Sequence, residues 1–245
     1  MTDLWYEESG SGRPVVLLHE GVVDSRIWAP FLPLVDDRLR TIRYDQRGYG
    51  RSPIWTGPYS VVDDLVSVLD AAGVEQAALV GTSRGGRIAI QAALERPERV
   101  SALVPVVSGL AGRPLDIEVT PEQEARWDAA EERGDLSELA AIDMEIWAPM
   151  GVDDELRAMF VENVEASNAD DPAEEAPSAG RLHEIAAPTL VITAARDVPA
   201  ITELGELLAR EIPGARLAVI EEADHMVQWR APEELARLVL EFLDH

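Results

Sequence analysis

Short runs of apolar residues alternate along the chain with longer stretches in which apolar positions recur at helical spacing. The first run, Val15-Val16-Leu17-Leu18, contains no polar position, which is typical of a strand buried on both faces of a parallel sheet. Further strands are predicted at 39–44, 77–80, 101–107, 189–193 and 217–220, and helices at 26–35, 61–72, 87–94, 200–210 and 232–243. This order predicts an α/β fold, a mostly parallel sheet with helices on both faces. Residues 2–8 are expected to add an antiparallel hairpin strand at one edge.

The alternation stops between residues 111 and 181, where the pattern is helical only. Helices are predicted at 121–133, 136–147 and 154–166, followed by a polar loop at 168–175. Three helices between two strands of one sheet indicate an inserted helical cap. We therefore expect an α/β core formed by residues 1–110 and 182–245 and a helical cap formed by residues 111–181.

The composition excludes several kinds of chemistry. The chain has 245 residues, enough for one large α/β domain with an insertion, and no Cys, which excludes a thiolate nucleophile and a Cys-bound metal. All 21 basic residues are Arg, which excludes a Schiff-base or Walker A lysine. The four His form no tight ligand motif such as His-Glu-x-x-His, so no metal site is expected.

The formal net charge of −25 lies mostly in the predicted cap, because residues 111–180 contain 20 acidic residues and 4 arginines. A surface of this sign repels nucleic acid and anionic lipid, so neither is an expected partner. The acidic cap favours neutral or cationic small-molecule substrates over anionic ones. No apolar run approaches the ~18 residues of a membrane span, and the acidic N-terminus lacks the apolar region of a secretory signal. We therefore expect no membrane insertion and a cytoplasmic location.

The segment Gly81-Thr82-Ser83-Arg84-Gly85 carries the most specific chemical signal in the chain. It follows the apolar run at 77–80 and precedes the helical stretch at 87–94, and a G-x-S-x-G segment in that context is typical of a nucleophile elbow. The flanking glycines are expected because a Cβ would clash where strand and helix approach each other. We predict that Ser83 is a catalytic nucleophile exposed at the carboxyl end of its strand.

A serine hydroxyl needs a general base, and a carboxylate must orient that base. His225 follows the last predicted strand, which places it at the same edge of the sheet as Ser83. The other three histidines are poorer candidates because they follow the first strand, precede the strand at 189–193 or end the chain: His19, His183 and His245. We predict that His225 is the base.

The orienting acid is expected at the end of another strand, and Asp197 follows the strand at 189–193. The neighbour of the predicted base, Asp224, is better suited to helix capping or solvation. Arg196 is expected to be a surface partner of an acid. We predict that Asp197 is the carboxylate that orients the base.

Acyl chemistry at a serine also needs two preorganised N–H donors for the oxyanion. One is expected to be the backbone N–H of Arg84, at the start of the helix. The second is expected from the loop that follows the first strand, and Gly21 is preferred because glycine lets the backbone approach the reacting carbonyl. His19, in the same loop, is expected to be a structural hydrogen-bonding residue.

These segments together resemble the α/β-hydrolase superfamily, specifically its small, capped, cofactor-free hydrolases. The resemblance covers nearly the whole chain and rests on five motifs: Leu18-His19-Glu20-Gly21, Asp45-Gln46-Arg47-Gly48-Tyr49-Gly50-Arg51-Ser52, the elbow, residues 193–197 and Asp224-His225. The order Ser83, Asp197, His225 matches the order of nucleophile, acid and base in that superfamily. The resemblance implies an enzyme without a cofactor and a mainly structural role for residues 45–52.

The chain departs from the family pattern at two positions beside the predicted oxyanion hole. Glu20 replaces the glycine that usually follows the histidine, and Arg84 replaces a residue that is often apolar. We hypothesise that Glu20 and Arg84 form a buried pair there. The alternatives are that Arg84 binds a substrate carboxylate, or that both side chains are solvated.

The pocket wall is expected to come from the loop after the first strand, the cap and the loop of the predicted base. The candidates for substrate contact are Glu20, Val22, Trp28, Trp147 and Met226. The other large apolar residues of the cap are expected mainly to pack its own core: Trp127, Met144, Met150, Met159 and Phe160.

The interpretation favoured by the sequence is a serine hydrolase that cleaves a small carboxylic ester or lactone through an acyl-enzyme on Ser83. Haloalkane dehalogenases and epoxide hydrolases are disfavoured because those relatives place Asp at the elbow. Rivals on the same scaffold are a cofactor-free perhydrolase or haloperoxidase-like enzyme, a carbon–carbon bond hydrolase and a non-catalytic ligand receptor.

Overall fold

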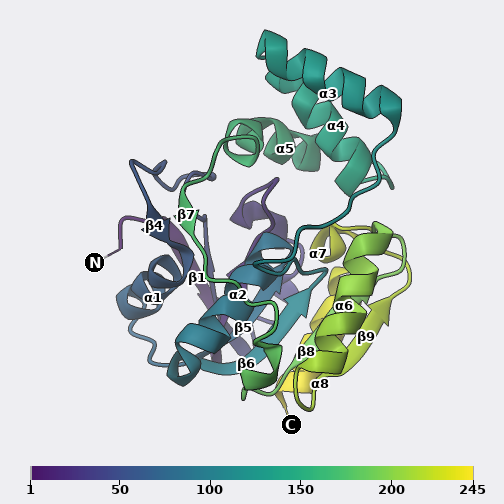
Figure 1. Ribbon diagram of the computed structural model, residues 1–245. Helices are drawn as coiled ribbons and strands as arrows, with labels where there is room; N and C mark the ends of the chain where they lie inside the picture. Colours follow the sequence, from purple (N-terminus) through teal and green to yellow (C-terminus); the bar gives the residue numbers. More distant parts are fainter. Residues whose placement is uncertain (1, 245) are drawn as a thin grey trace.

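A seven-stranded sheet forms the centre of the computed structural model, which describes residues 2–244 (Figure 1). Its strands are β1 (Tyr6–Gly10), β2 (Arg13–Leu18), β3 (Leu39–Tyr44), β5 (Ala77–Thr82), β6 (Val100–Val106), β8 (Leu190–Ala194) and β9 (Arg216–Ile220). The order across the sheet is β1-β3-β2-β5-β6-β8-β9, and every neighbouring pair is parallel except β1 and β3. The predicted mostly parallel sheet is confirmed.

Helices cover both faces of the sheet. The longer ones in the core are α1 (Val61–Ala71), α2 (Arg84–Glu95), α6 (Pro199–Glu211) and α8 (Pro232–Leu243), and the short ones are η1 (Ser25–Trp28), η2 (Leu32–Leu34), η3 (Pro97–Arg99), η4 (Leu182–Glu184) and α7 (Val227–Arg230). Successive residues of β2 point to opposite faces: Val15 lies in a core cluster shared with η1 and α8, whereas Val16 lies in a cluster shared with α1, α2 and α6. This packing explains why residues 15–18 of β2 include no polar position.

Three helices lie between β6 and β8 in the chain and are grouped above one edge of the sheet in Figure 1. They are α3 (Pro121–Arg133), α4 (Leu136–Trp147) and α5 (Asp154–Ser167), close to the predicted ranges. Most of their buried apolar residues belong to the same core cluster as Val15 and α8. The division of the chain at residues 111 and 181 into core and cap remains a prediction.

The chain returns from the cap to the core through residues 168–180, which we call the strap. Within the strap, β7 (Ala173–Glu174) pairs in parallel with β4 (Tyr59–Ser60), which precedes α1. The polar loop predicted at 168–175 is largely present, but the sequence did not predict β7, because its pairing partner lies more than a hundred residues earlier in the chain. Figure 1 shows β4 and β7 side by side at one flank of the molecule.

Two other local predictions need correction. The helix expected at 26–35 is two short 3-10 helices, η1 and η2, because Pro30 and Pro33 cannot donate the backbone hydrogen bonds of a continuous helix. The edge strand begins at Tyr6 and does not form a hairpin with the strand that follows it. It pairs with β3 instead, since β2 already has parallel neighbours on both sides.

Two findings concern only the described part of the chain. Within residues 2–244, no helix has both the length and the apolar composition that crossing a membrane requires. The terminal His245 lies outside the described residues, so its interpretation is not tested.

Candidate active site

Ser83 sits on a strained turn between the last residue of β5 and the first residue of α2, with φ of 50° and ψ of −113°. A positive φ is rare for a residue other than glycine and costs about 1–3 kcal/mol, which the surrounding structure must supply. A Cβ built on Gly81 would lie 2.3 Å from the Gly85 carbonyl oxygen, and one on Gly85 would lie 2.3 Å from the Leu18 carbonyl oxygen. The expected reason for both glycines is confirmed.

His225 and Asp197 lie together in the loops that follow β9 and β8. His225 Nδ1 and Asp197 Oδ2 are 2.7 Å apart, and both side chains are almost fully buried. The other oxygen of Asp197 accepts a hydrogen bond from the Val198 backbone N–H, also 2.7 Å long. Asp197 therefore fixes a protonated Nδ1 and leaves Nε2 of His225 free to accept a proton.

Ser83 and His225 line the same cavity of about 250 Å³. In the part of the chain that the structure describes, residues 2–244, no hydrogen bond joins the two side chains. Such contacts are often long without substrate and shorten when substrate binds. The cavity is thus lined by both a hydroxyl and an oriented imidazole.

The charges around His225 favour its protonated form. Burial alone would lower the pKa of His225, but the charge and hydrogen bond of Asp197, with the charges of Glu20 and Asp224, raise it above its usual range. The indole of Trp147, from the end of α4, lies against the imidazole with 4.6 Å between ring centroids. A base that is readily protonated beside a cavity suits general base chemistry.

The two predicted oxyanion donors, Gly21 and Arg84, both line this cavity. Arg84 is the first residue of α2, where a backbone N–H has no partner inside the helix. The peptide that carries the Gly21 N–H has its carbonyl on Glu20, and that oxygen lies 2.7 Å from His19 Nδ1. The next peptide is held by a 2.9 Å hydrogen bond from the Tyr49 hydroxyl to the Gly21 carbonyl. A Cβ on Gly21 would meet Arg84 Cδ only at 3.5 Å, an ordinary contact, so space alone does not require glycine there.

His19 has the structural role that the sequence predicted. Its Nδ1 lies 2.7 Å from the Glu20 carbonyl oxygen, and its Nε2 accepts a 2.9 Å hydrogen bond from the Gln46 backbone N–H. Full burial lowers the pKa of His19, which keeps the ring neutral. With both ring nitrogens engaged, His19 is not available as a second base.

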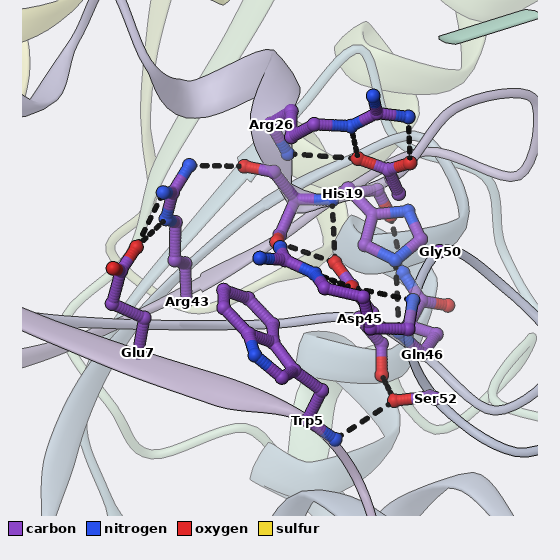
Figure 2. A network of polar contacts seen from close by, with 12 residues as sticks. Trp5, Glu7, His19, Arg26, Arg43, Asp45, Gln46, Gly50 and Ser52 are labelled. Atoms are coloured by element: carbon purple, nitrogen blue, oxygen red, sulfur yellow. Dashed lines mark hydrogen bonds and ion pairs between the residues drawn. The ribbon is translucent and has the colours of Figure 1, made fainter.

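Residues 45–52 make polar contacts with the loop that follows β2, as Figure 2 shows. Asp45 is fully buried and accepts hydrogen bonds from the Ser25 backbone N–H at 3.1 Å and from Arg51 Nε at 3.0 Å. Its own carbonyl accepts from Ser52 Oγ, which in turn accepts from the Trp5 backbone N–H. Arg51 thus pairs inside the segment, whereas Arg47 pairs outside it with Asp3 and Asp64. These contacts fit the mainly structural role expected for residues 45–52.

The hypothesis of a Glu20–Arg84 pair is wrong, and so is the alternative that both side chains are solvated. Glu20 is fully buried and accepts hydrogen bonds from Thr82 and Gln228. Arg84 points to the opposite side, where its Nη2 lies 2.6 Å from Asp171 of the strap. An arginine paired near the surface keeps part of its hydration, which a pair in the core would lose.

Five predicted pocket residues divide into two groups. Glu20, Val22 and Trp147 line the cavity. Trp28 and Met226 do not, since both are completely buried in the core, and Trp28 packs edge-on against the ring of Phe31. Their apolar character reflects core packing, not substrate contact.

Six further residues line the cavity and were missed by the sequence analysis: Tyr49, Arg87, Gly109, Leu115, Ile117 and Ser167. Arg87 could have been found, because a residue four positions after Ser83 lies on the same face of α2. Val107, which directly follows β6, has φ of 41° and is a second strained position near the elbow. No motif in the sequence indicates that strain.

Two predictions about charged neighbours had different outcomes. Arg196 pairs with Glu222 at the surface, as expected. Asp224 neither caps a helix nor faces solvent: it is buried and accepts hydrogen bonds from the Met150 backbone N–H at 3.1 Å and from Arg230 Nε at 3.0 Å. Asp224 thereby joins the loop of His225 to the junction between α4 and α5.

Among residues 2–244, no three His, Cys, Asp or Glu side chains come together in the way that would hold a metal ion.

Comparisons with known proteins show the family to which the chain belongs. A 2-hydroxy-6-oxononadienedioate/2-hydroxy-6-oxononatrienedioate hydrolase of Burkholderia vietnamiensis is 31% identical over 97% of this chain and 90% of its own. A protein of Azorhizobium caulinodans, provisionally named carbamate hydrolase RutD, is 29% identical over 98% of this chain and 94% of its own. The enol-lactonase of Burkholderia xenovorans LB400 superposes with a TM-score of 0.82 at 25% identity, over 99% of this chain and 96% of its own. A family model described as alpha/beta hydrolase fold matches residues 14–149, more than half of the sequence, and the chain therefore belongs to the α/β-hydrolase family.

Proposed function

We propose that this protein is a serine hydrolase that cleaves a small carboxylic ester or lactone through an acyl-enzyme on Ser83. The observation that carries the proposal is the 2.7 Å contact between His225 Nδ1 and Asp197 Oδ2, in a cavity that Ser83 also lines. A base oriented by a carboxylate, beside a hydroxyl on a strained elbow, is the arrangement that activates serine for acyl transfer. The hydrolase relatives support the same class of chemistry.

In the proposed mechanism, Ser83 Oγ attacks the substrate carbonyl carbon while His225 Nε2 takes its proton. The backbone N–H groups of Gly21 and Arg84 hold the oxyanion. The bond to the leaving oxygen breaks as the imidazolium returns the proton to it. His225 then takes a proton from water while the water oxygen attacks the acyl carbon. The bond from that carbon to Ser83 Oγ breaks as the imidazolium gives its proton to Oγ, and the acid leaves. Asp197 holds Nδ1 protonated throughout, and no step needs a cofactor.

The charges at the cavity support a neutral substrate. Arg84 is already paired with Asp171 at 2.6 Å, and Arg87 with Glu175 at 3.0 Å, both from the strap. The carboxylate of Glu20, without an ion-pair partner within residues 2–244, adds negative charge at the wall. An anionic substrate would have to displace an acid of the strap and approach a buried carboxylate, whereas a neutral ester does neither.

The size and lining of the cavity support a small acyl group. A volume of about 250 Å³ lies just below the ~300–1,000 Å³ of typical ligand pockets. Leu115, Ile117 and Trp147 supply its apolar wall. These features favour a compact ester or lactone over a long acyl chain.

The proposal is tested by the intact mass of the protein after exposure to a fluorophosphonate probe, on wild type and Ser83→Ala. A single adduct on wild type that is absent from Ser83→Ala supports an activated serine, and a panel of activated esters and lactones then gives the substrate class. No adduct on folded wild type, or the same adduct on both proteins, contradicts it. Ligand-dependent thermal shifts without turnover would favour the receptor alternative, and faster turnover of peroxide than of water would favour a perhydrolase.

The relative that is 31% identical supports a second candidate, a carbon–carbon bond hydrolase. The same serine and histidine could cleave a vinylogous diketone, with a carbanion in place of the alkoxide as leaving group. Such a substrate belongs in the panel beside the esters. Its cleavage at a kcat/KM above that of the best ester would replace the ester assignment and keep Ser83 as the nucleophile.

A further inference from the structure

Glu20 is a buried carboxylate with no cationic partner within residues 2–244. Its Oε2 accepts hydrogen bonds from Thr82 Oγ1 at 2.6 Å and from Gln228 Nε2 at 2.8 Å, and its Oε1 accepts from the same Gln228 nitrogen at 3.0 Å. Burying a charge without a counter-charge costs several kcal/mol even when it is hydrogen-bonded. A residue with this cost, next to a site of chemistry, calls for a functional reason.

The three residues of this cluster each stand beside a different part of the candidate site. Glu20 directly precedes Gly21, Thr82 directly precedes Ser83, and Gln228 lies one turn after His225, in α7. They come from the loop after β2, the end of β5 and the loop after β9. The carboxylate of Glu20 therefore joins the oxyanion loop, the elbow and the segment that follows His225. The sheet alone does not join them, because β9 is not a neighbour of β2 or β5.

The charge of Glu20 also reaches His225. The charged groups that face His225 are Asp197, Glu20 and Asp224, and the cap contributes the uncharged ring of Trp147. Asp224 is offset by its ion pair with Arg230, 3.0 Å long. Besides Asp197, Glu20 is thus the unbalanced negative charge in this group, and it is buried, where charges interact more strongly than in bulk water.

We propose that Glu20 is a positioning residue of the candidate site: its carboxylate holds the oxyanion loop, the elbow and the loop of His225 together, and its charge stabilises the imidazolium that forms when Ser83 loses its proton. This inference rests on the proposed function for its catalytic meaning. It gives a role to the glutamate that stands where relatives of the family usually have glycine. Its two parts, the hydrogen bonds and the charge, can be separated by mutation.

Glu20→Gln removes the charge and keeps the size and an accepting oxygen, whereas Thr82→Val keeps the charge and removes one hydrogen bond. We expect Glu20→Gln to lower the pKa of His225 by about 1, because a nearby opposite charge favours the charged form. Thr82→Val should leave that pKa close to the wild-type value. Both are measured by NMR titration of the imidazole protons of folded protein, with His225→Gln to assign the signal.

The NMR titration does not depend on turnover, so the inference and the proposed function can fail separately. If the pKa of His225 is the same in Glu20→Gln and wild type, the charge of Glu20 does not act on the base and the inference is overturned. If the pKa falls but no ester or lactone is hydrolysed by wild type, the proposed function fails and the electrostatic role of Glu20 stands.

Turnover of a neutral activated ester gives the second readout. For activity that needs neutral His225, the acid limb of kcat/KM should move to lower pH in Glu20→Gln, and kcat at the plateau should fall about 10-fold. Thr82→Val should lower kcat with its acid limb unmoved, because only the alignment is disturbed. A loss of thermal stability in Glu20→Gln with kcat and the acid limb unchanged would show a purely structural glutamate and contradict the inference.

Discussion

The two walls of the cavity are held by different forces. On the core wall, His225, Asp197 and Glu20 are at most 2% exposed, and hydrogen bonds join the loops that carry them. On the cap wall, the strap contacts α2 through ion pairs whose side chains are 12–31% exposed. Buried hydrogen bonds have no competitor, whereas exposed ion pairs compete with water and salt. The loops at the edge of the sheet therefore fix the positions of the candidate catalytic groups. The cap controls access to the cavity through ion pairs that water and salt can replace.

We expect mutations in the two walls to have different kinetic effects. Variants of the core wall should lower kcat, from about 10-fold for Glu20→Gln to several orders of magnitude for Asp197→Asn, with little change in KM, since they disturb groups that act in the transition state. Variants of the cap wall should act mainly on KM, salt dependence or stability.

The largest effect is expected from Asp197→Asn. The amide keeps the shape but favours the wrong imidazole tautomer, so kcat for an activated ester should fall about 10³–10⁴-fold with KM nearly unchanged. The control is Arg196→Gln, next in the chain, which breaks only the surface pair with Glu222 and should keep full activity. The test is steady-state kinetics of the two variants and wild type, with circular dichroism to confirm that each variant is folded. Equal activity of Asp197→Asn and wild type would remove Asp197 from the candidate site.

The core wall could be predicted from the sequence because each of its residues follows a strand. Parallel strands bring their carboxyl ends to one edge, so Ser83, Asp197 and His225 converge wherever the strands are correctly identified. The partner of Glu20 could not be predicted in the same way. Gln228 lies in a short helix after the last strand, and nothing in its spacing shows that it returns to the loop after β2.

The cap wall was predicted less well. The three cap helices follow from apolar periodicity, but the residues that reach the cavity, such as Leu115 and Ile117, lie in a segment without regular structure. The sequence predicts that Asp171 lies in a polar loop, because acidic residues usually face solvent. Its pairing with Arg84 depends on how the strap returns across the core, which is a tertiary property.

The next largest effect is expected in stability, from Asp143 inside the cap. Burial raises the pKa of Asp143 to about 6, and the hydrogen bond from Ser167 Oγ is long, at 3.5 Å. A carboxyl whose pKa is raised by folding destabilises the protein as pH rises from about 4 to about 6, because the unfolded chain ionises first. Asp143→Asn should therefore raise the free energy of unfolding by about 2 kcal/mol at pH 8 and leave it unchanged below pH 4.

Denaturant unfolding at pH 4 and pH 8 tests this expectation. Glu145→Gln is the control, since that carboxylate lies on the cap surface beside Arg126 and should give no gain at either pH. A gain of equal size at both pH values would show that the benefit of Asp143→Asn comes from packing and not from the removed charge. The contrast with Glu20 would then weaken, because both buried carboxylates would be tolerated without electrostatic consequence.

A smaller effect is expected from Trp147, the cap residue in contact with the base. Trp147→Ala removes a ring 4.6 Å from His225 and opens the apolar wall, so kcat/KM for a small ester should fall about 10-fold, mainly through KM. Trp127→Ala is the control, because Trp127 lies in α3 and does not line the cavity. If Trp147→Ala lowers kcat as much as Asp197→Asn does, the cap also sets the geometry of the base, and the division between the two walls fails.

The smallest effect concerns the strap. Asp171→Asn removes the charge that pairs with Arg84 and keeps an oxygen that can accept from Tyr59, so kcat on a neutral ester should stay within about 2-fold of wild type. An ester of the same size that carries a carboxylate should gain about 3–5-fold in kcat/KM, since the freed guanidinium can then accept an anion. This gain should shrink in high salt. If the anionic ester gains nothing, Arg84 is held by Gln46 and Tyr59 irrespective of the strap, and the cap wall is as fixed as the core wall.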